Sequence, residues 1–320
     1  MTPKEKFIKA LKREPIVGHV PHFELVFYLT MEAFGKVHPS HRSYYQWYQM
    51  SVRERELQIQ DMADVYIRTA EKYHHNAIFV HPNPGHLDDT VRLLEAIRER
   101  TGDTYYLTMH GDPTFYIPEG SNMMEFSMSL YDEPEEMKQR AEKQLADSLK
   151  FAEEMAAHHP GLLDGFALCS DYCLNTNPFF SPSLFEEFIA PYLKRVIDEY
   201  RSMGLYSIKH TDGNIMPILE QIVECGPDAI HSLDPQGGVS IPEVRRITKG
   251  RVALCGNVNC GLLQTGTEEE CIADVRRSLK EGMEAPGYIF CTSNCVYTGM
   301  PLERYELMNR IWREEGIYNS

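Results

Sequence analysis

The segment Tyr206-Ser-Ile-Lys-His210-Thr-Asp212-Gly213-Asn214 joins a short strand pattern to polar residues and a glycine, and helical patterns flank it. Where strands alternate with helices, ligands bind at the carboxyl ends of the strands. His210 and Asp212 are two residues apart, so an extended backbone places both side chains on one face. An imidazole beside a carboxylate suits metal ligation, proton transfer or substrate anchoring. The structural alternative is a histidine at a strand end, with Asp212 capping the next helix.

Strand-like runs alternate with amphipathic helical patterns along the whole chain. We predict strands at residues 20–27, 77–80, 105–110, 165–169, 206–210, 229–232, 252–256 and 288–291. Helices are predicted at residues 44–71, 88–100, 133–157, 181–203, 216–225, 241–247, 268–281 and 301–315. This alternation indicates an α/β protein, a (β/α)8 TIM barrel in a single domain over residues 1–320, with an N-terminal helical segment. The alternative, an open doubly wound sheet, needs a glycine fingerprint after the first strand, and the sequence has none.

The composition excludes several classes of protein. With 320 residues, 42% of them hydrophobic, the chain can bury a large core, and its formal charge of −15 argues against a nucleic-acid partner. There is no signal peptide and no apolar run near the roughly 20 residues that cross a bilayer, so we expect no membrane partner. The eight cysteines stand mostly inside predicted strands and helices. We therefore expect a cytoplasmic protein with reduced thiols.

In a barrel, the residues that end each strand face one mouth. These residues are Glu24, His81, Asp112, Asp171, Tyr172, His210, Asp212, Asp234, Asn257, Asn259, Cys291 and Asn294. Carboxylates that converge there should shift one another's pKa or collect a cation. Asp112-Pro113 is equally typical of a plain turn, and Asp234-Pro235 is more typical of a turn than of a site. Polar insertions at residues 82–89 and 111–123 are predicted to lie over the mouth as lids.

A metal site is one interpretation of this ring. Catalytic zinc takes three protein ligands and leaves a fourth position open. His210 and Cys291 suit such a set, with Asp212 or Glu24 as the third ligand; alternatively, Cys291 is a small buried strand residue. Nucleophilic catalysis has little support, because the sequence contains no G-x-S-x-G elbow.

Several segments resemble the uroporphyrinogen decarboxylase superfamily, nearly end to end and in the family's order. They are Thr2-Pro-Lys-Glu-Lys-Phe-Ile-Lys-Ala-Leu-Lys-Arg-Glu-Pro15, Val20-Pro21, Ser181-Pro-Ser-Leu-Phe-Glu-Glu-Phe-Ile-Ala-Pro-Tyr192, His210-Thr-Asp-Gly-Asn214, Cys255-Gly-Asn-Val258, and Gly287-Tyr-Ile-Phe290 with Pro301. The resemblance implies a (β/α)8 barrel and one of two chemistries. One branch decarboxylates uroporphyrinogen III without a cofactor. The other comprises cobalamin-dependent methyltransferases, several of which use zinc to activate a thiol.

The chain departs from both branches. Where the decarboxylase has Arg-Gln-Ala-Gly-Arg-Tyr, whose arginines bind substrate carboxylates, this chain has Glu24-Leu-Val-Phe-Tyr-Leu29, and Pro82 stands in place of the pyrrole-binding aspartate. The thiol-activating methyltransferases have His-x-Cys on strand five, and here the motif is His210-Thr-Asp212. Their cysteine after strand eight is matched by Asn294, with Cys295 adjacent. The resemblance is therefore closer to the methyltransferase-type members.

The leading hypothesis is a methyltransferase that moves a methyl group from a small donor, such as a methoxylated aromatic or a methylamine, to a corrinoid protein. We expect His210 and Asp212 to act on the leaving group, and Asp171 and Glu24 to position substrate. Substrate-binding residues are predicted to be His81, Asp112, Tyr172, Asn257 and Asn294. Zinc is the expected metal, held by His210, Asp212 and Cys291, and the corrinoid comes from the partner protein.

Two other functions remain open, and a homodimer is possible in each case. One is a lyase that decarboxylates a tetrapyrrole or a smaller acid, with Asp171 or His210 protonating the carbanion. The other is a non-catalytic barrel that binds a corrinoid or tetrapyrrole. The fold alone does not choose among them.

Overall fold

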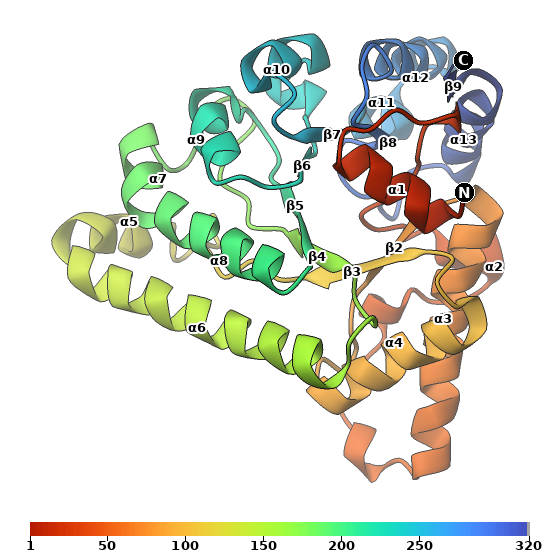
Figure 1. The fold of residues 1–320 in the computed structure, drawn as a ribbon, viewed down its shortest axis with the longest axis horizontal. Coiled ribbons are helices and arrows are strands. Elements are labelled where there is room, and N and C mark those ends of the chain that lie inside the picture. The colour runs from red at the N-terminus through yellow and green to blue at the C-terminus, as the bar shows by residue number, and fades with distance from the viewer. Residues whose placement is uncertain (319–320) are drawn as a thin grey trace.

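The computed structural model describes residues 1–318, and a curled sheet of parallel strands forms its centre (Figure 1). Seven strands pair in chain order: β2 (Ala77–Val80), β3 (Tyr106–His110), β4 (Gly165–Leu168), β5 (Tyr206–His210), β6 (Ala229–His231), β7 (Ala253–Val258) and β8 (Tyr288–Thr292). All six pairings are parallel. The predicted α/β barrel is confirmed.

Helices connect the strands and surround the sheet (Figure 1). The α-helices are α1 (Pro3–Leu11), α2 (Thr30–Phe34), α3 (Val52–Tyr73), α4 (Leu87–Thr101), α5 (Met123–Asp132), α6 (Pro134–His158), α7 (Pro182–Phe188), α8 (Ala190–Ser202), α9 (Leu219–Glu224), α10 (Ile241–Thr248), α11 (Cys260–Thr265), α12 (Glu268–Gly282) and α13 (Leu302–Glu315). Short 3₁₀ turns are η1 (Pro39–His41), η2 (Trp47–Gln49), η3 (Met216–Ile218) and η4 (Pro235–Gly237). Within residues 1–318, no helix has both the length and the apolar composition needed to cross a bilayer.

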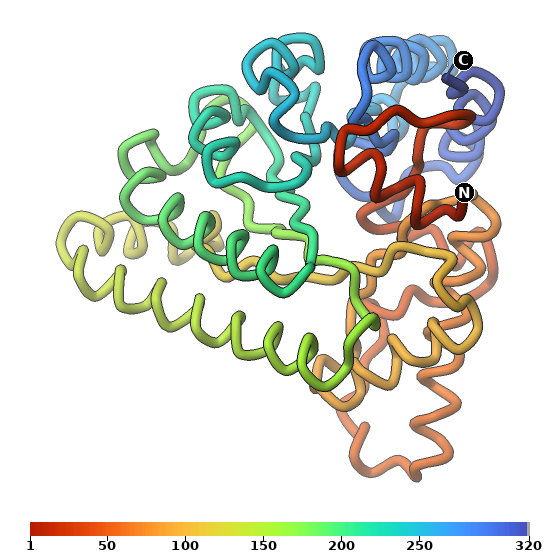
Figure 2. The backbone as a smooth tube through the Cα atoms, in the orientation of Figure 1, coloured from red at the N-terminus to blue at the C-terminus, as the bar shows by residue number. Residues whose placement is uncertain are grey.

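The prediction of a regular strand at residues 20–27 is wrong. Residues 20–27 occupy the eighth place in the barrel, between β8 and the start of β2, but their backbone pairing with β8 and its following loop is limited to isolated bridges, His22 to Phe290 and Phe27 to Val296. Pro21 has no N–H to donate, and the chain bends after β8, so a continuous ladder does not form. The regular strand β1 (Gly18–His19) pairs instead with β9 (Ile317–Tyr318), which joins the two ends of the chain (Figure 2).

Two predicted helices also need correction. The helix predicted at residues 181–203 is divided at Ile189 into α7 and α8, because Pro191 has no N–H to donate to the carbonyl four residues earlier and its ring crowds that carbonyl. The helix predicted at residues 44–71 begins only at Val52. Ser51 caps it, accepting a hydrogen bond from the Glu54 N–H.

The N-terminal helix α1 closes one end of the barrel. Its Phe7 ring lies 5.3 Å from the ring of Phe23 and 4.7 Å from that of Tyr106. These rings belong to a buried cluster that also contains Ile208 and Cys291. Because packed side chains fill this end, polar chemistry is confined to the carboxyl ends of the strands.

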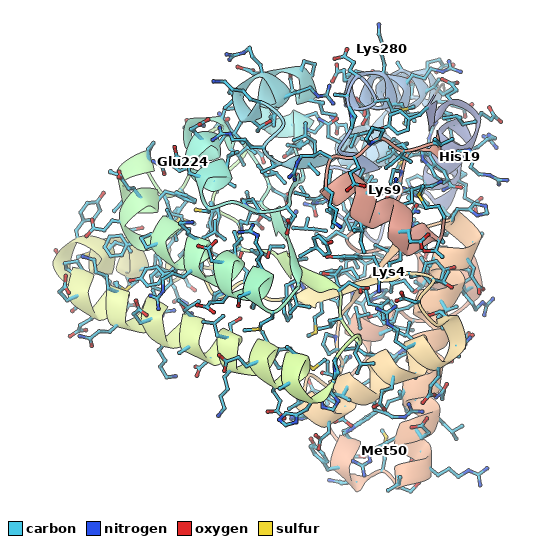
Figure 3. The ribbon with its side chains drawn as sticks, viewed as in Figure 1. Lys4, Lys9, His19, Met50, Glu224 and Lys280 are labelled. Carbon is cyan, nitrogen blue, oxygen red and sulfur yellow. The ribbon has the colours of Figure 1, made fainter. Side chains whose placement is uncertain are left out.

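Two insertions rise at the mouth. The segment 28–51 projects from the barrel with Met50 near its tip (Figure 3), and it contacts the loop 82–89. The Asn83 side-chain amide ties the two together by donating to the carbonyl oxygens of Pro39 and Arg42, at 2.6 and 2.8 Å. On the other side, the Ile117 N–H of the loop 111–123 donates to the Asp171 carbonyl at 3.0 Å. That loop therefore reaches the end of β4.

Strand β5 carries a fully buried ion pair on its outer face. The Lys209 ammonium lies 2.7 Å from a carboxylate oxygen of Asp112 and donates to the carbonyl oxygens of Leu168 and Ser170. It also lies 4.0 Å above the Tyr172 ring centroid. The pair thus fastens β5 to the ends of β3 and β4.

Replacing Lys209 tests this role. We expect Lys209→Met to lower the free energy of unfolding by about 3–5 kcal/mol, because the Asp112 carboxylate would be buried without its partner. Urea denaturation in EDTA measures the loss. The matched control is Lys143→Met, whose exposed pair with Asp147 spans 3.5 Å and should contribute less than about 1 kcal/mol. Equal losses in both variants would contradict the structural role.

Candidate functional site

Three polar side chains converge at the end of β5. The His210 Nε2 atom lies 3.8 Å from Oδ1 of Asp171 and 3.8 Å from Oδ1 of Asp212. One ligand atom from each residue falls within 4.8 Å of the other two. Among residues 1–318, this is the only such group of three or more His, Cys, Asp and Glu side chains. The His-x-Asp motif and Asp171 therefore lie together, as the strand-end pattern suggested.

The backbone after β5 holds this arrangement in place. The Asp212 N–H donates to Oδ1 of Asp171 at 3.0 Å, which joins the β4 and β5 loops. Gly213 follows with φ +76, and a Cβ atom there would lie 2.4 Å from the Leu174 carbonyl oxygen. Only glycine tolerates both the left-handed geometry and that close approach. The tight turn directs Asp212 back toward His210.

Asp212 is the most constrained member of the cluster. Burial raises the pKa of its carboxyl above the usual value, the negative charges of Asp171 and Asp234 raise it further, and His210 opposes the shift. The Asn294 amide donates to Oδ2, whereas Oδ1 is buried and lacks a well-aligned hydrogen-bond donor; the Ser232 hydroxyl lies close enough to lower the pKa of the carboxyl. A buried acceptor without a donor is costly. A cation between Oδ1, His210 and Asp171 would satisfy it, so these residues fit a metal ion.

The second ring nitrogen of His210 points into the barrel. Its Nδ1 lies 2.7 Å from Nδ1 of His231, at the end of β6. His231 is fully buried, and burial holds its pKa well below the ordinary value. Sequence reasoning placed His231 inside a predicted strand without assigning it a role. The register of the strands could have revealed this contact, since His210 and His231 are paired positions on the adjacent strands β5 and β6.

Glu24 lies inside the wall rather than beside His210. Thr292 donates to Oε2 of Glu24 from its backbone N–H at 3.2 Å and from its hydroxyl at 2.5 Å. A cavity of about 30 Å³, room for about one water molecule, lies against it. Burial raises the pKa of Glu24 to about 8, and the bonds from Thr292 only partly offset this shift. Glu24 is therefore a buried acid that favours its neutral form.

Asp112 and Tyr172 point away from the mouth. Besides Lys209, the Asp112 carboxylate accepts from the N–H and hydroxyl of Thr114 and from the Ser170 N–H. Tyr172 is fully buried, and its hydroxyl lies 2.6 Å from that of Thr114. The structure does not bring either residue to the cluster.

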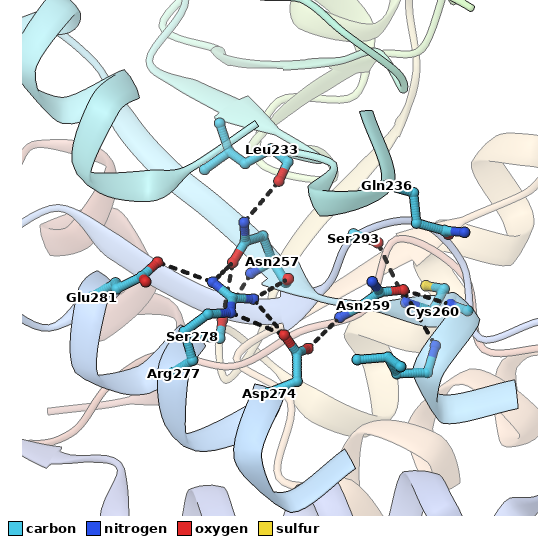
Figure 4. A network of polar contacts seen from close by, with 12 residues as sticks. Leu233, Gln236, Asn257, Asn259, Cys260, Asp274, Arg277, Ser278, Glu281 and Ser293 are labelled. Carbon is cyan, nitrogen blue, oxygen red and sulfur yellow. Dashed lines mark hydrogen bonds and ion pairs between the residues drawn. The ribbon is translucent and has the colours of Figure 1, made fainter. Parts of the chain in front are cut away.

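Asn257 likewise has its polar atoms engaged by the protein (Figure 4). Its amide donates to the Leu233 carbonyl at 2.8 Å, and its side-chain oxygen accepts from Arg277 at 3.1 Å. The residue is fully buried. Asn259 caps α11 by accepting from the N–H groups of Gly261 and Leu262. These two asparagines hold the β7 loop in shape.

Cys291 and Asn294 separate in the structure. Cys291 is fully buried in the apolar cluster at the closed end and lies outside the His210 group. Burial raises the pKa of its thiol well above the usual value, which disfavours the thiolate that metals bind. Asn294, by contrast, contacts Asp212 directly.

Asp234 accepts a hydrogen bond from the Gln236 N–H and begins η4, as expected for a turn residue.

His81 belongs to a second group of imidazoles at the mouth. Its ring centroid lies 4.9 Å from that of His110 and 6.0 Å from that of His38. Burial lowers the pKa of His81 to about 2, and the neighbouring imidazoles add to this effect. Desolvation of the His110 ring, followed by the charge of His210, lowers its pKa. His110 was recognised only as the last residue of a predicted strand.

Glu24 gives a prediction about pH. Between its ordinary pKa of 4.5 and its folded value of about 8, the native state keeps a proton that the unfolded state loses. This residue should therefore lower the free energy of unfolding as pH rises through that interval, by up to about 1.4 kcal/mol per pH unit. We expect the stability of Glu24→Gln relative to wild type to increase by a few kcal/mol from pH 5 to pH 8.

Urea denaturation in EDTA at both pH values measures this difference. Glu153→Gln, at an exposed position of α6, is the matched control and should show no such trend. A constant difference between wild type and Glu24→Gln would disprove the raised pKa.

Comparisons with known proteins extend these observations. The model of the family described as Uroporphyrinogen decarboxylase (URO-D) matches residues 113–314. Two curated proteins named Uroporphyrinogen decarboxylase, from Anaeromyxobacter dehalogenans (strain 2CP-C) and Anaeromyxobacter sp. (strain Fw109-5), are 34% and 32% identical over 118 residues. The match covers 37% of this chain and 32% of each relative. It thus spans about a third of the relatives' length.

Solved structures agree on the fold. A methyltransferase from Methanosarcina mazei matches with a TM-score of 0.72 over 98% of this chain and 99% of that one, at 18% identity. A GH5_18 protein from Streptomyces cattleya, in complex with GlcNAc, matches with a TM-score of 0.52 at 12% identity, over 93% of this chain and 82% of that one. At these identities, the likeness establishes the barrel and nothing about chemistry.

Proposed function

The chain belongs to the uroporphyrinogen decarboxylase family, and from this premise we propose that it is a methyltransferase that moves a methyl group from a small donor to a corrinoid protein. The observation that carries the proposal is the cluster of Asp171, His210 and Asp212 at the mouth. The whole-chain fold match to a methyltransferase is consistent with it.

The charge of the mouth disfavours a polyanionic tetrapyrrole substrate. Asp171, Asp212 and Asp234 lie close enough for the first and third to raise the pKa of the second. The basic residue next to them in sequence, Lys209, turns outward to Asp112. A substrate with many carboxylates would meet negative charge here without the arginines that bind it in the decarboxylase branch. A small donor with few or no negative charges suits this mouth better.

Zinc suits the ligand set that we propose. Asp171, His210 and Asp212 would supply the three protein ligands of a catalytic zinc site. When bound, zinc would act as a Lewis acid toward the heteroatom that carries the methyl group. Asn294 holds Asp212 through Oδ2 and leaves Oδ1 free for the metal, while the Asp171 side chain is 46% exposed and would face an incoming donor.

Decarboxylation is the second candidate, and one observation favours it. Burial and neighbouring carboxylates raise the pKa of Asp212, so this carboxyl can carry a proton beside His210. A protonated acid at a mouth can deliver that proton to a carbanion after carbon dioxide leaves. This chemistry needs no metal, which separates the two candidates experimentally.

Metal binding provides the first test. We expect wild-type protein to bind one zinc ion, and His210→Ala or Asp212→Asn to weaken binding at least 100-fold, because each loses one of three ligands. Competition with a chromophoric chelator measures the affinity. His158→Ala, which removes a 65% exposed side chain on α6, is the control and should bind as wild type does.

Turnover provides the second test. Zinc-loaded protein is expected to methylate reduced corrinoid in the presence of a methoxylated aromatic or a methylamine, and to lose this activity when EDTA removes the metal. The absorbance of methyl-cobalt reports the product. Metal-independent release of carbon dioxide, with no methyl transfer across a broad panel of donors, would establish the lyase instead.

A further inference from the structure

The imidazoles of His210 and His231 face each other through their Nδ1 atoms, 2.7 Å apart. A hydrogen bond of that length needs one nitrogen that carries the hydrogen and one with a free lone pair. The contact therefore couples the tautomers of the two rings. A hydrogen on Nδ1 of His210 requires a bare Nδ1 on His231, and the reverse also holds.

The surroundings of the two rings differ. His210 Nε2 faces the carboxylates of Asp171 and Asp212, each 3.8 Å away. His231 is fully buried, its ring lies 6.0 Å from that of Phe23, and its Nε2 has no hydrogen-bond partner among residues 1–318. No carboxylate contacts His231 within the described residues, and the polar groups next to its ring are His210 and the backbone of Thr292.

A metal ion can reach only one nitrogen of His210. Nδ1 is already in contact with His231 and lies on the barrel side of the ring, whereas Nε2 opens toward the two carboxylates. A neutral imidazole that binds metal through Nε2 carries its hydrogen on Nδ1. Metal-bound histidines donate that hydrogen to a neighbouring acceptor, and loss of the acceptor weakens the site.

We propose that His231 is a positioning residue that accepts the Nδ1 hydrogen of His210 and thereby reserves Nε2 of His210 for the metal. The inference rests on the metal site of the proposed function, but it does not depend on methyl transfer. His231 then carries its own hydrogen on Nε2. It fixes both the tautomer and the orientation of the His210 ring from inside the barrel.

Two substitutions at one position separate positioning from packing. His231→Leu keeps an apolar side chain among apolar neighbours and removes the acceptor, so we expect zinc affinity to fall 10- to 100-fold. His231→Asn retains an oxygen acceptor near the position of Nδ1 and should stay within about threefold of wild type. Chelator competition measures the affinities, and thermal unfolding in EDTA verifies that each variant folds.

His75 supplies the matched control. It is another buried imidazole, bonded through Nε2 to the Tyr305 hydroxyl at 2.9 Å, and it lies outside the candidate metal cluster. His75→Leu should bind zinc as wild type does. An equal loss of affinity in this variant would show that any buried histidine matters to the fold and would overturn the specific role of His231.

Nitrogen-15 NMR of zinc-loaded wild type tests the tautomers directly and requires no variant. The expected spectrum has His210 protonated at Nδ1 and metal-bound at Nε2, with His231 protonated at Nε2. A hydrogen on Nδ1 of His231, or unchanged zinc affinity in His231→Leu, would overturn the inference while leaving the metal site intact. If the wild-type protein binds no zinc, both the methyltransferase proposal and the role of His231 are disproved. If it binds zinc without transferring methyl groups, only the methyltransferase proposal is disproved.

Discussion

The alternation of side chains along β5 is the constraint on which the rest of the site depends. Lys209 points outward to Asp112 and ties the strand to β3 and β4, and the next residue, His210, points inward to His231. Because successive side chains of a strand face opposite sides, the buried ion pair and the imidazole contact fix one another's direction. A one-residue slip of β5 would bury His210 in the helix layer and place an ammonium in the barrel.

Crowding of like charge follows from that geometry. With His210 directed inward, the turn at Gly213 places Asp212 beside Asp171, and burial then disfavours the negative charge of Asp212. Proteins ordinarily relieve such crowding with an arginine or lysine. Here the adjacent lysine is already committed to Asp112, and an oxygen of Asp212 stays without a donor. The repulsion between the carboxylates at the mouth is therefore not relieved by the protein, and a bound divalent cation would relieve it.

Much of this architecture was predictable from sequence, because periodicity and strand-end chemistry are local properties. The bounds of β2 and β5 and the convergence of Asp171, His210 and Asp212 followed from such signals. The direction of a polar side chain at a strand end could not be predicted from these signals. A shift of one residue along the strand decides whether a side chain faces the mouth or the helices. Asp112, Tyr172 and Asn257 look identical to mouth residues in sequence, yet they bond to other strands and helices. The role of His231 could not be predicted from local sequence, because its partner His210 lies 21 residues away in the chain.

The donor atoms of the cluster bear on the substrate of the proposed enzyme. One imidazole nitrogen and two carboxylate oxygens are harder ligands than the thiolates implied for the zinc-dependent relatives, and Cys291 lies outside the cluster. Thiolates donate more electron density to zinc than carboxylates do, so an oxygen-rich set leaves the ion more electrophilic. Such a site is better suited to withdraw electrons from the oxygen or nitrogen of a methyl donor than to raise the nucleophilicity of a thiol. In the proposed enzyme, an aspartate at position 212 in place of the relatives' cysteine would therefore favour the donor side of methyl transfer, and His231 would keep His210 Nε2 available as the one nitrogen ligand.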